Sequence, residues 1–185
     1  MKTRLRIRKG LYTLGLLALW GLAIGVPAGR AGAGAVDKSS LDSKVHRELV
    51  TLPWYGVFDN LEYRVNGSQV ILSGQVVSEH SQTKHDAENA VKRIPGITEV
   101  VNQIEVLPPL PFDDQIRRDE YRAIFSQSNL GGYSMGSLPQ IRIIVNGGHV
   151  TLEGTVMNQM DRNIAGLAAN SVSNVFSVTN NLKIG

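Results

Sequence analysis

The stretch that decides the fold occurs twice, as VNGSQVILSGQV at residues 65–76 and as VNGGHVTLEGTV at residues 145–156. Each copy is typical of two strands joined by an Asn-Gly turn, because these residues tolerate the positive φ angles of a tight hairpin. Apolar residues alternate along the second strand of each copy, so we expect one face of that strand to be buried. Glycine interrupts this face at Gly74 and Gly154, which indicates a bulge or the close approach of another backbone.

The same order of elements surrounds both hairpins, which predicts an internal duplication. We expect helices at 41–52 and 78–93 and strands at 61–65 and 97–106 around the first hairpin. In the second copy we expect helices at 114–128 and 163–173 and strands at 140–145, 149–156 and 175–184. Asn174 ends the later alanine-rich helix where the first copy has Gly96, and both residues suit a left-handed cap. The predicted fold class is α+β: two tandem α-β-β-α-β units, each a three-stranded mixed sheet with two helices on one face.

Outside the repeat the sequence has a leader and a short linker. Residues 1–35 combine a basic start, an apolar run and small residues before a candidate cleavage site, as a secretory signal peptide does. The alternative is an uncleaved membrane anchor, although the run of about 16 residues is shorter than the roughly 20 that span a bilayer. We expect domains at 36–107 and 113–185, joined by a proline-rich linker at 108–112. Asp113 is expected to cap the first helix of the second domain.

The charge of the chain is divided unevenly between the leader and the remainder. The formal net charge is +3, from 19 basic and 16 acidic residues, and six of the basic residues precede the first acidic one. Without those six, 13 basic residues face 16 acidic ones, so the remainder is near −3. A net acidic body argues against binding nucleic acid through broad electrostatics. The chain has no cysteine, which excludes disulfides and thiolate metal sites.

The sequence contains no set of residues typical of catalysis. His80 and His85 are five residues apart, a poor spacing for two metal ligands on one helix face, so we expect neither a metal nor a cofactor. The serines lack a nucleophile-elbow context, and Gly131-Gly132 lacks the Lys that a phosphate-binding loop requires. Two pairs of neighbouring carboxylates are interpreted as charges near helix N-termini: Asp113 with Asp114, and Asp119 with Glu120. We therefore expect that the protein is not an enzyme.

A candidate lipid-binding surface lies on the helix that opens the second copy. Cations beside aromatic rings suit an anionic membrane surface, because rings lie at the headgroup level while Arg meets phosphate. The candidate residues are Arg118, Tyr121, Arg122 and Phe125, together with Leu130 and Tyr133 of the Gly- and Ser-rich loop 126–138. The alternative is that Tyr121 and Phe125 pack into the core or into a contact between the domains.

For two further groups of apolar residues the sequence also does not decide between exposure and packing. Trp54, Tyr55 and Phe58 form a rival aromatic patch in the first copy, which core packing would also explain. Ile164 and Leu167 lie off the alanine stripe of the last helix, so they are either exposed or face the other copy.

The ordered set of motifs resembles the BON domain, a family named for bacterial osmotically induced and nodulation proteins. It rests on the Val-x-Leu-x-Gly-x-Val strand, the alanine-rich helix, the sequence IPGI at residues 94–97 and the alternating third strand. The structural positions in the two copies are Gly67, Gly74, Gly96, Asn102, Gly147, Gly154 and Asn180. The amides of Asn102 and Asn180 either bind a ligand or form hydrogen bonds with nearby backbone, and we favour the second role.

The resemblance implies a function as well as a fold. It implies a periplasmic protein associated with phospholipid or the cell envelope, without catalysis. The chain lacks a lipobox cysteine, which argues against a lipoprotein anchor, and loop 126–138 is not accounted for by the family pattern. The leading hypothesis is a protein that binds anionic phospholipid at the membrane surface and supports envelope integrity under stress. The alternative is a protein- or polysaccharide-binding module of an envelope complex without lipid affinity. The sequence does not indicate the oligomeric state.

Overall fold

The computed structural model describes residues 38–136 and 138–185, so the predicted signal peptide at 1–35 lies outside the described residues. The first half of the described chain contains α1 (Lys38–Val50), β1 (Asn60–Asn66), β2 (Gln69–Val76), the 3₁₀ helix η1 (Ser78–His80), α2 (Ser81–Lys92), β3 (Glu99–Asn102) and β4 (Glu105–Val106). The second half contains α3 (Pro111–Phe125), the 3₁₀ helix η2 (Gly131–Ser134), β5 (Ile141–Asn146), β6 (His149–Val156), α4 (Gln159–Asn170), β7 (Ser177–Asn180) and β8 (Lys183–Ile184).

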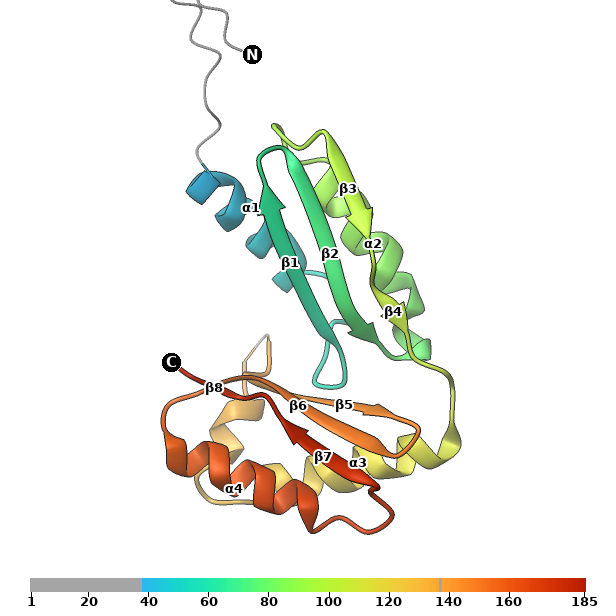
Figure 1. Ribbon diagram of the computed structural model, residues 1–185, viewed down its shortest axis with the longest axis vertical. Helices are drawn as coiled ribbons and strands as arrows, with labels where there is room; N and C mark the ends of the chain where they lie inside the picture. Colours follow the sequence, from blue (N-terminus) through green and yellow to red (C-terminus); the bar gives the residue numbers. More distant parts are fainter. Residues whose placement is uncertain (1–37, 137) are drawn as a thin grey trace, which may run out of the picture. The chain divides into compact units, whose positions relative to one another are not determined.

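Each half is a mixed sheet with its two helices on one face, as the sequence predicts (Figure 1). In the first half β1 and β2 are antiparallel, whereas β3 and β4 both run parallel to β2. The second half repeats this pattern, with β5 antiparallel and β7 and β8 parallel to β6. The α+β class and the duplication are therefore confirmed.

The third strand of each half is divided into two segments by an asparagine. The Asn102 side chain accepts a hydrogen bond from Ile104 N at 3.1 Å and donates to the Lys84 carbonyl of α2 at 2.9 Å. Asn180 does the same with Leu182 N at 3.2 Å and the Arg162 carbonyl of α4 at 2.8 Å. Each amide thus fastens the second helix to the strand beside it, and the predicted strands 97–106 and 175–184 are interrupted at this point.

The glycine in the second strand of each hairpin is required by a close backbone contact. Gly74 has φ +106°, and a Cβ atom added there would lie 2.0 Å from the Asn60 carbonyl oxygen. Gly154 has φ +121°, and its added Cβ would lie 1.9 Å from the Gln140 carbonyl oxygen. Both the conformation and the space exclude any residue with a side chain.

Each half has its own apolar core, formed where the alternating strand face meets the helix stripes. In the first half Val70, Leu72 and Val76 of β2 are fully buried, as are Ala87 and Val91 of α2. The alanines allow α2 to lie close to the sheet, which places the larger strand side chains between the two layers. The second half buries these residues at the matching positions: Val150, Leu152, Val156, Ala165 and Ala169.

The start of α3 differs from the prediction. The helix begins at Pro111, three residues before the expected 114, because proline is well suited to the first helical position. Asp113 is not the N-cap, which is Leu110; instead its carboxylate accepts hydrogen bonds from Gly147 N and Gly148 N, both at 2.8 Å. Asp113 therefore fastens α3 to the turn of the β5–β6 hairpin.

The start of α4 also differs, whereas the cap that follows the helix is found as expected. Asn158 caps α4 by accepting a hydrogen bond from Asp161 N, so the helix begins at Gln159, four residues before the expected 163. Asn174 has φ +68°, the left-handed conformation predicted from its match with Gly96.

Candidate functional site

An apolar groove of about 370 Å³ lies where the loop between α1 and β1 meets α3. Val57 and Phe58 contribute from the loop, and Arg118, Tyr121 and Arg122 contribute from α3. The rings of Phe58 and Tyr121 meet edge to face with their centroids 6.4 Å apart. The loop is held in place by its backbone, because the Val57 carbonyl accepts a hydrogen bond from Ile143 N at 2.8 Å.

The two arginines flank this groove with their charged groups toward solvent. Arg118 donates a hydrogen bond to Gln115 at 2.9 Å, and Arg122 pairs with Asp119, one turn earlier on α3. The Arg122 side chain is 72% exposed. Hydrogen bonds from Gln115 and Arg122 lower the pKa of Asp119, so this carboxylate stays ionised beside the arginines. The groove therefore combines an apolar floor with guanidinium groups that an anionic ligand can reach.

The structure brings together only part of the predicted lipid-binding set. Arg118, Tyr121 and Arg122 share the groove. The Phe125 ring contacts the Tyr121 ring at a tilt of 58°, with the centroids 4.9 Å apart, and packs partly against the core of the second half. Leu130 and Tyr133 lie elsewhere, because both are buried in the core of the second half. The candidate surface is therefore narrower than the sequence indicated.

The rival aromatic patch of the first half is not a single patch in the structure. Phe58 belongs to the groove, whereas Tyr55 is buried and its hydroxyl accepts a hydrogen bond from Leu61 N at 3.1 Å. Trp54 is 73% exposed and has φ +68°, a conformation that a bulky residue rarely adopts. Such strain is found at functional sites, and Trp54 is in the loop that supplies Val57 and Phe58.

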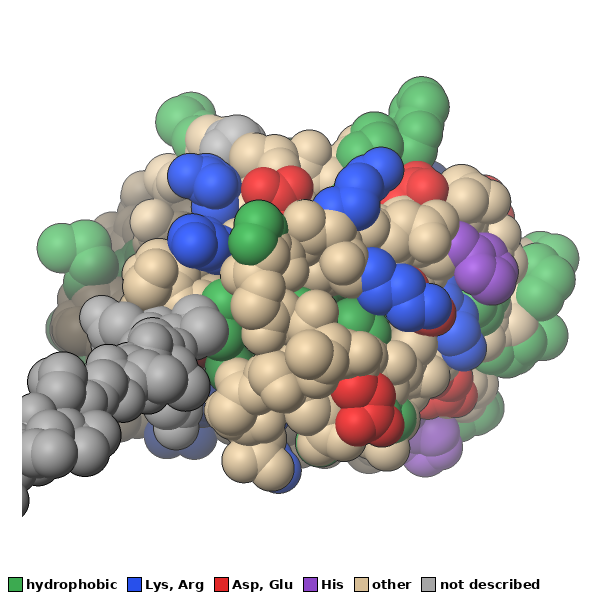
Figure 2. Space-filling view, turned by 90° about the horizontal axis from the view of Figure 1, so that it is seen from above, with side chains coloured by type: hydrophobic (Ala, Val, Ile, Leu, Met, Phe, Trp, Pro, Cys, Tyr) green, Lys and Arg blue, Asp and Glu red, His purple; other side chains and the backbone are tan. Residues whose placement is uncertain are grey.

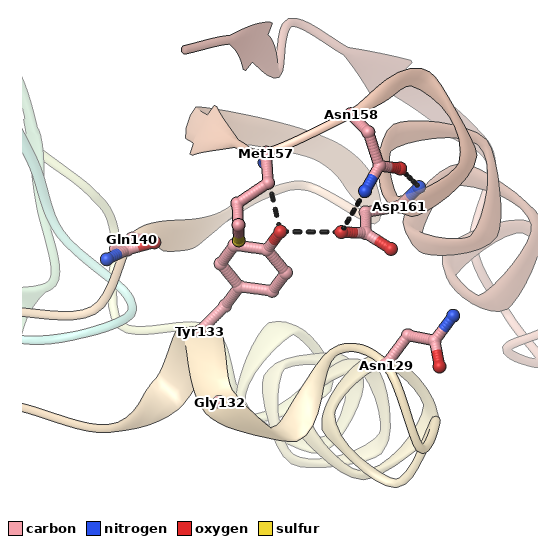
Figure 3. A pocket seen from close by; sticks show the side chains of 7 residues that line it. All are labelled: Asn129, Gly132, Tyr133, Gln140, Met157, Asn158 and Asp161. Atoms are coloured by element: carbon pink, nitrogen blue, oxygen red, sulfur yellow. Dashed lines mark hydrogen bonds between the residues drawn. The ribbon is translucent and has the colours of Figure 1, made fainter.

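A second, polar cavity of about 500 Å³ is centred on Tyr133 (Figure 3). The Tyr133 hydroxyl donates to Asp161 at 2.6 Å and accepts from Met157 N at 3.0 Å. Asp161 also accepts a hydrogen bond from the Asn158 side chain at 3.0 Å. Burial and the hydrogen bond to Asp161 raise the pKa of Tyr133, so the hydroxyl keeps its proton. This network joins loop 126–138 to the start of α4, which gives that loop a structural role.

In the first half, the backbone N–H equivalent to that of Met157 finds its hydrogen-bond acceptor in a different residue. There Val77 N, which corresponds to Met157 N, donates to the buried Asp59 carboxylate at 2.9 Å. Asp59 also accepts from Gly56 N at 3.0 Å and lies 2.7 Å from His80 Nδ1. The sequence signals for this cluster, an Asp before the first strand and a His before α2, were too weak to identify it. All these groups are satisfied internally, which is typical of a structural network.

A buried carboxylate on α3, Glu120, was also missed. Its side chain is fully buried, and neither carboxylate oxygen has a hydrogen-bond partner. Burial, with a smaller contribution from the Asp119 charge, raises the pKa of Glu120 to about 8. The interpretation of Asp119 and Glu120 as a helix N-terminal pair is wrong for both residues, because α3 begins at Pro111 and only Asp113 and Asp114 lie in its first turn; Glu120 is on the inward face of the helix. The nearby cation Arg117 is engaged elsewhere, with Asp114 and the Val145 carbonyl.

Charges of both signs are mixed over the part of the surface seen in Figure 2, where blue and red side chains alternate with uncharged ones. Among residues 38–136 and 138–185 no group of three or more His, Asp and Glu is arranged to hold a metal ion. Within the same residues no helix is both long and apolar enough to span a membrane.

Comparison with known proteins identifies the repeated unit. Residues 37–108 and 113–185 each match the model of a family described as BON domain. A search of curated proteins gives no match.

Among solved structures the chain is similar to two from Chlamydia trachomatis. One is described as CdsD, a structural protein of the type III secretion system; it is 10% identical, the match covers 79% of this chain and 92% of that chain, and the TM-score is 0.32. The other is the C-terminal domain of CdsD, 11% identical, with 81% and 100% of the two chains covered and a TM-score of 0.31. Likeness at this level says nothing about function.

Proposed function

Since the chain belongs to the BON domain family, we propose that it is a non-enzymatic periplasmic protein that binds anionic phospholipid and supports the integrity of the cell envelope under stress. Proteins with this domain are often periplasmic and linked to the membrane or the envelope. One observation carries the proposal: an apolar groove on α3 is flanked by the exposed cations Arg118 and Arg122.

The chemistry of the groove matches a phospholipid at the membrane surface. A guanidinium group binds phosphate oxygens through two parallel hydrogen bonds, which two arginines one turn apart can offer to one or two headgroups. Val57, Phe58 and Tyr121 then face the upper acyl chains, where burying apolar surface adds to the affinity. Asp119 competes with phosphate for Arg122, so binding replaces an ion pair that is already present.

A pelleting assay tests the role of the arginines. The purified protein is centrifuged with phosphatidylcholine vesicles that contain or lack phosphatidylglycerol. Replacing Arg118 and Arg122 by Gln removes about 2 kcal/mol of attraction to an anionic surface, or roughly 30-fold in partitioning. The matched control replaces Arg47 and Arg64, exposed arginines of the first half, and changes the net charge equally. Equal losses in both variants, or no pelleting of the unmodified protein, would exclude the proposed site.

Tryptophan fluorescence tests whether the loop before β1 takes part. The sequence has two tryptophans, Trp20 and Trp54, so the variant Trp20→Phe reports on Trp54 alone. Because Trp54 is exposed, its emission is expected to shift to shorter wavelength when the loop meets anionic vesicles. An unchanged spectrum in the presence of pelleted protein would place this loop outside the contact.

The polar cavity at Tyr133 is the observation that supports the alternative function, a polysaccharide-binding module. Its lining includes the amide side chains of Asn129 and Gln140, which can exchange hydrogen bonds with sugar hydroxyls, whereas the Asn158 amide is already bonded to Asp161. A polysaccharide-binding module would pellet with peptidoglycan and not with vesicles. Replacing Asn129, whose side chain lines the cavity, by Ala would then weaken pelleting with peptidoglycan, whereas the arginine variants would not.

A further inference from the structure

An exposed apolar stripe runs along the outer face of α4 and consists of Met160, Ile164 and Leu167. Met160 and Leu167 are 64% and 72% exposed, and Ile164 between them is half-buried, because it also packs against the core of the second half. Met160, Ile164 and Leu167 are spaced four and three residues apart within α4, which places the three on one side of the helix. Apolar surface of this extent on one helix face usually has a partner. The sequence left open whether Leu167 is exposed or faces the other half, and the structure shows that it is exposed.

The duplicated fold shows that the stripe is not required for folding. The buried residues Ala87 and Ala90 of α2 match Ala165 and Ala168 of α4, which aligns the two helices with an offset of 78 residues. By this alignment the three stripe positions within α4, at 160, 164 and 167, correspond to Gln82, Asp86 and Asn89 in the first half. The same place in the same fold is thus polar in one copy and apolar in the other.

The residues around the stripe indicate what covers it. The exposed polar residues of α4 are the amides Gln159, Asn163 and Asn170. The helix also contains two charged residues: Asp161 is buried, and Arg162, partly buried, donates to the Asn180 carbonyl at 3.1 Å. A helix that lies on an anionic membrane carries Lys or Arg beside its apolar face, and the exposed face of α4 does not.

An uncharged face edged by amides is complementary to itself. When a surface meets its own copy across a two-fold axis, a charge near the axis opposes the same charge of the other copy, whereas an amide offers both a donor and an acceptor. We therefore propose that α4 is a contact between two copies of this chain, with the two helices antiparallel and the stripes facing each other. This proposal depends on α4 alone and is independent of the arginine groove.

The size of the stripe sets the expected affinity. A helix of 12 residues is about 18 Å long, so a pair of such helices buries less surface than the roughly 1,200–2,000 Å² of a stable complex. The association is therefore expected to be weak and to depend on protein concentration. Antiparallel packing also places opposite ends of the helix dipoles side by side.

Cysteine crosslinking tests the contact at its centre. The chain has no cysteine, so a single introduced thiol can bridge only to another copy. Ile164 lies near the middle of the stripe, where the two-fold axis would bring it close to itself. Full-length Ile164→Cys is expected to form a disulfide dimer under mild oxidation, while the matched control Asp86→Cys on α2 remains monomeric. Equal crosslinking of the two variants, or none in Ile164→Cys, would overturn the proposal.

Sedimentation of the full chain gives a second, independent readout. Met160→Gln with Leu167→Asn transfers the outer residues of α2 to α4 at two exposed positions, where the fold tolerates polar groups. The unmodified chain is expected to associate with rising concentration, and the variant to lose at least ten-fold in association. A chain whose sedimentation is the same with and without the substitutions refutes the contact. Loss of vesicle pelleting without any change in association would assign the stripe to the membrane and also overturn it.

Discussion

The buried carboxylate of Glu120 gives the strongest prediction for stability. The stripe Ile116, Glu120 and Ile124 of α3 has the same spacing as Leu41, Val45 and Leu49 of α1. Glu120 therefore occupies the core position that a valine fills in the first half. Replacing it by Val restores the apolar residue that the fold accommodates there, so Glu120→Val is expected to stabilise the protein at neutral pH.

The size of the effect follows from the pKa shift. The pKa of Glu120 rises from 4.5 in the unfolded chain to about 8 in the folded protein, so the folded state favours the protonated acid. The contribution of protonated Glu120 to the free energy of unfolding is fully present below pH 4.5. It is lost as the pH rises toward 8, by about 1.4 kcal/mol per pH unit. At pH 7 Glu120 in the folded protein is still mostly protonated, and keeping this proton costs about 3 kcal/mol of stability relative to pH 4.5, which Glu120→Val removes.

Urea denaturation at several pH values between 5 and 8 measures the difference. The free-energy advantage of Glu120→Val over the unmodified protein is expected to grow by about 1.4 kcal/mol per pH unit across this range. Asp119→Asn, which removes the exposed neighbouring carboxylate, provides the control and should show no such trend. Parallel profiles for Glu120→Val and the unmodified protein would show that the carboxylate is hydrated or paired, and would refute the reasoning.

Three further substitutions probe single contacts, each followed by thermal or urea unfolding. Tyr133→Phe leaves Met157 N without its acceptor and is expected to cost about 1–3 kcal/mol; an unchanged midpoint would mean that water replaces the hydroxyl. Asp113→Ala removes both hydrogen bonds to the β5–β6 turn and should cost about 2–4 kcal/mol, with Asp114→Ala as a milder control. Trp54→Gly relieves a left-handed backbone and should be about 1 kcal/mol more stable than Trp54→Ala; equal stabilities would show that no strain is stored there.

The fold could be predicted because its determinants are local and occur twice. Hairpin turns, alternating strands and alanine stripes each follow from the spacing of a few neighbouring residues, and the second copy supports the interpretation of the first. The predicted start of a helix was wrong where the expected capping side chain bonds to a distant part of the fold instead. Asp113 is a residue type that often caps helices, yet its hydrogen-bond partners are Gly147 and Gly148, in a hairpin more than 30 residues away.

The candidate site was only partly predictable, because exposure depends on tertiary packing. Arg118, Tyr121 and Arg122 could be grouped from helix spacing alone, but Val57 and Phe58 come from a loop about 60 residues earlier. Leu130 and Tyr133 of the Gly- and Ser-rich loop 126–138 were expected to reach the surface. Both side chains are buried instead, and the Tyr133 hydroxyl bonds to Asp161, whereas Met135 of the same loop is 74% exposed.

Comparison of the two halves separates the residues that the fold needs from those that it leaves free. Gly74 and Gly154 agree because a carbonyl oxygen occupies the space of a side chain, and the asparagines of the third strand agree because each fastens a helix. At other positions the halves differ although the backbone is the same. The second half has a carboxylate in its core and an apolar outer stripe on α4, and neither feature helps the isolated domain to fold. A fold requirement would have appeared in both halves, so these differences direct functional tests to the second one.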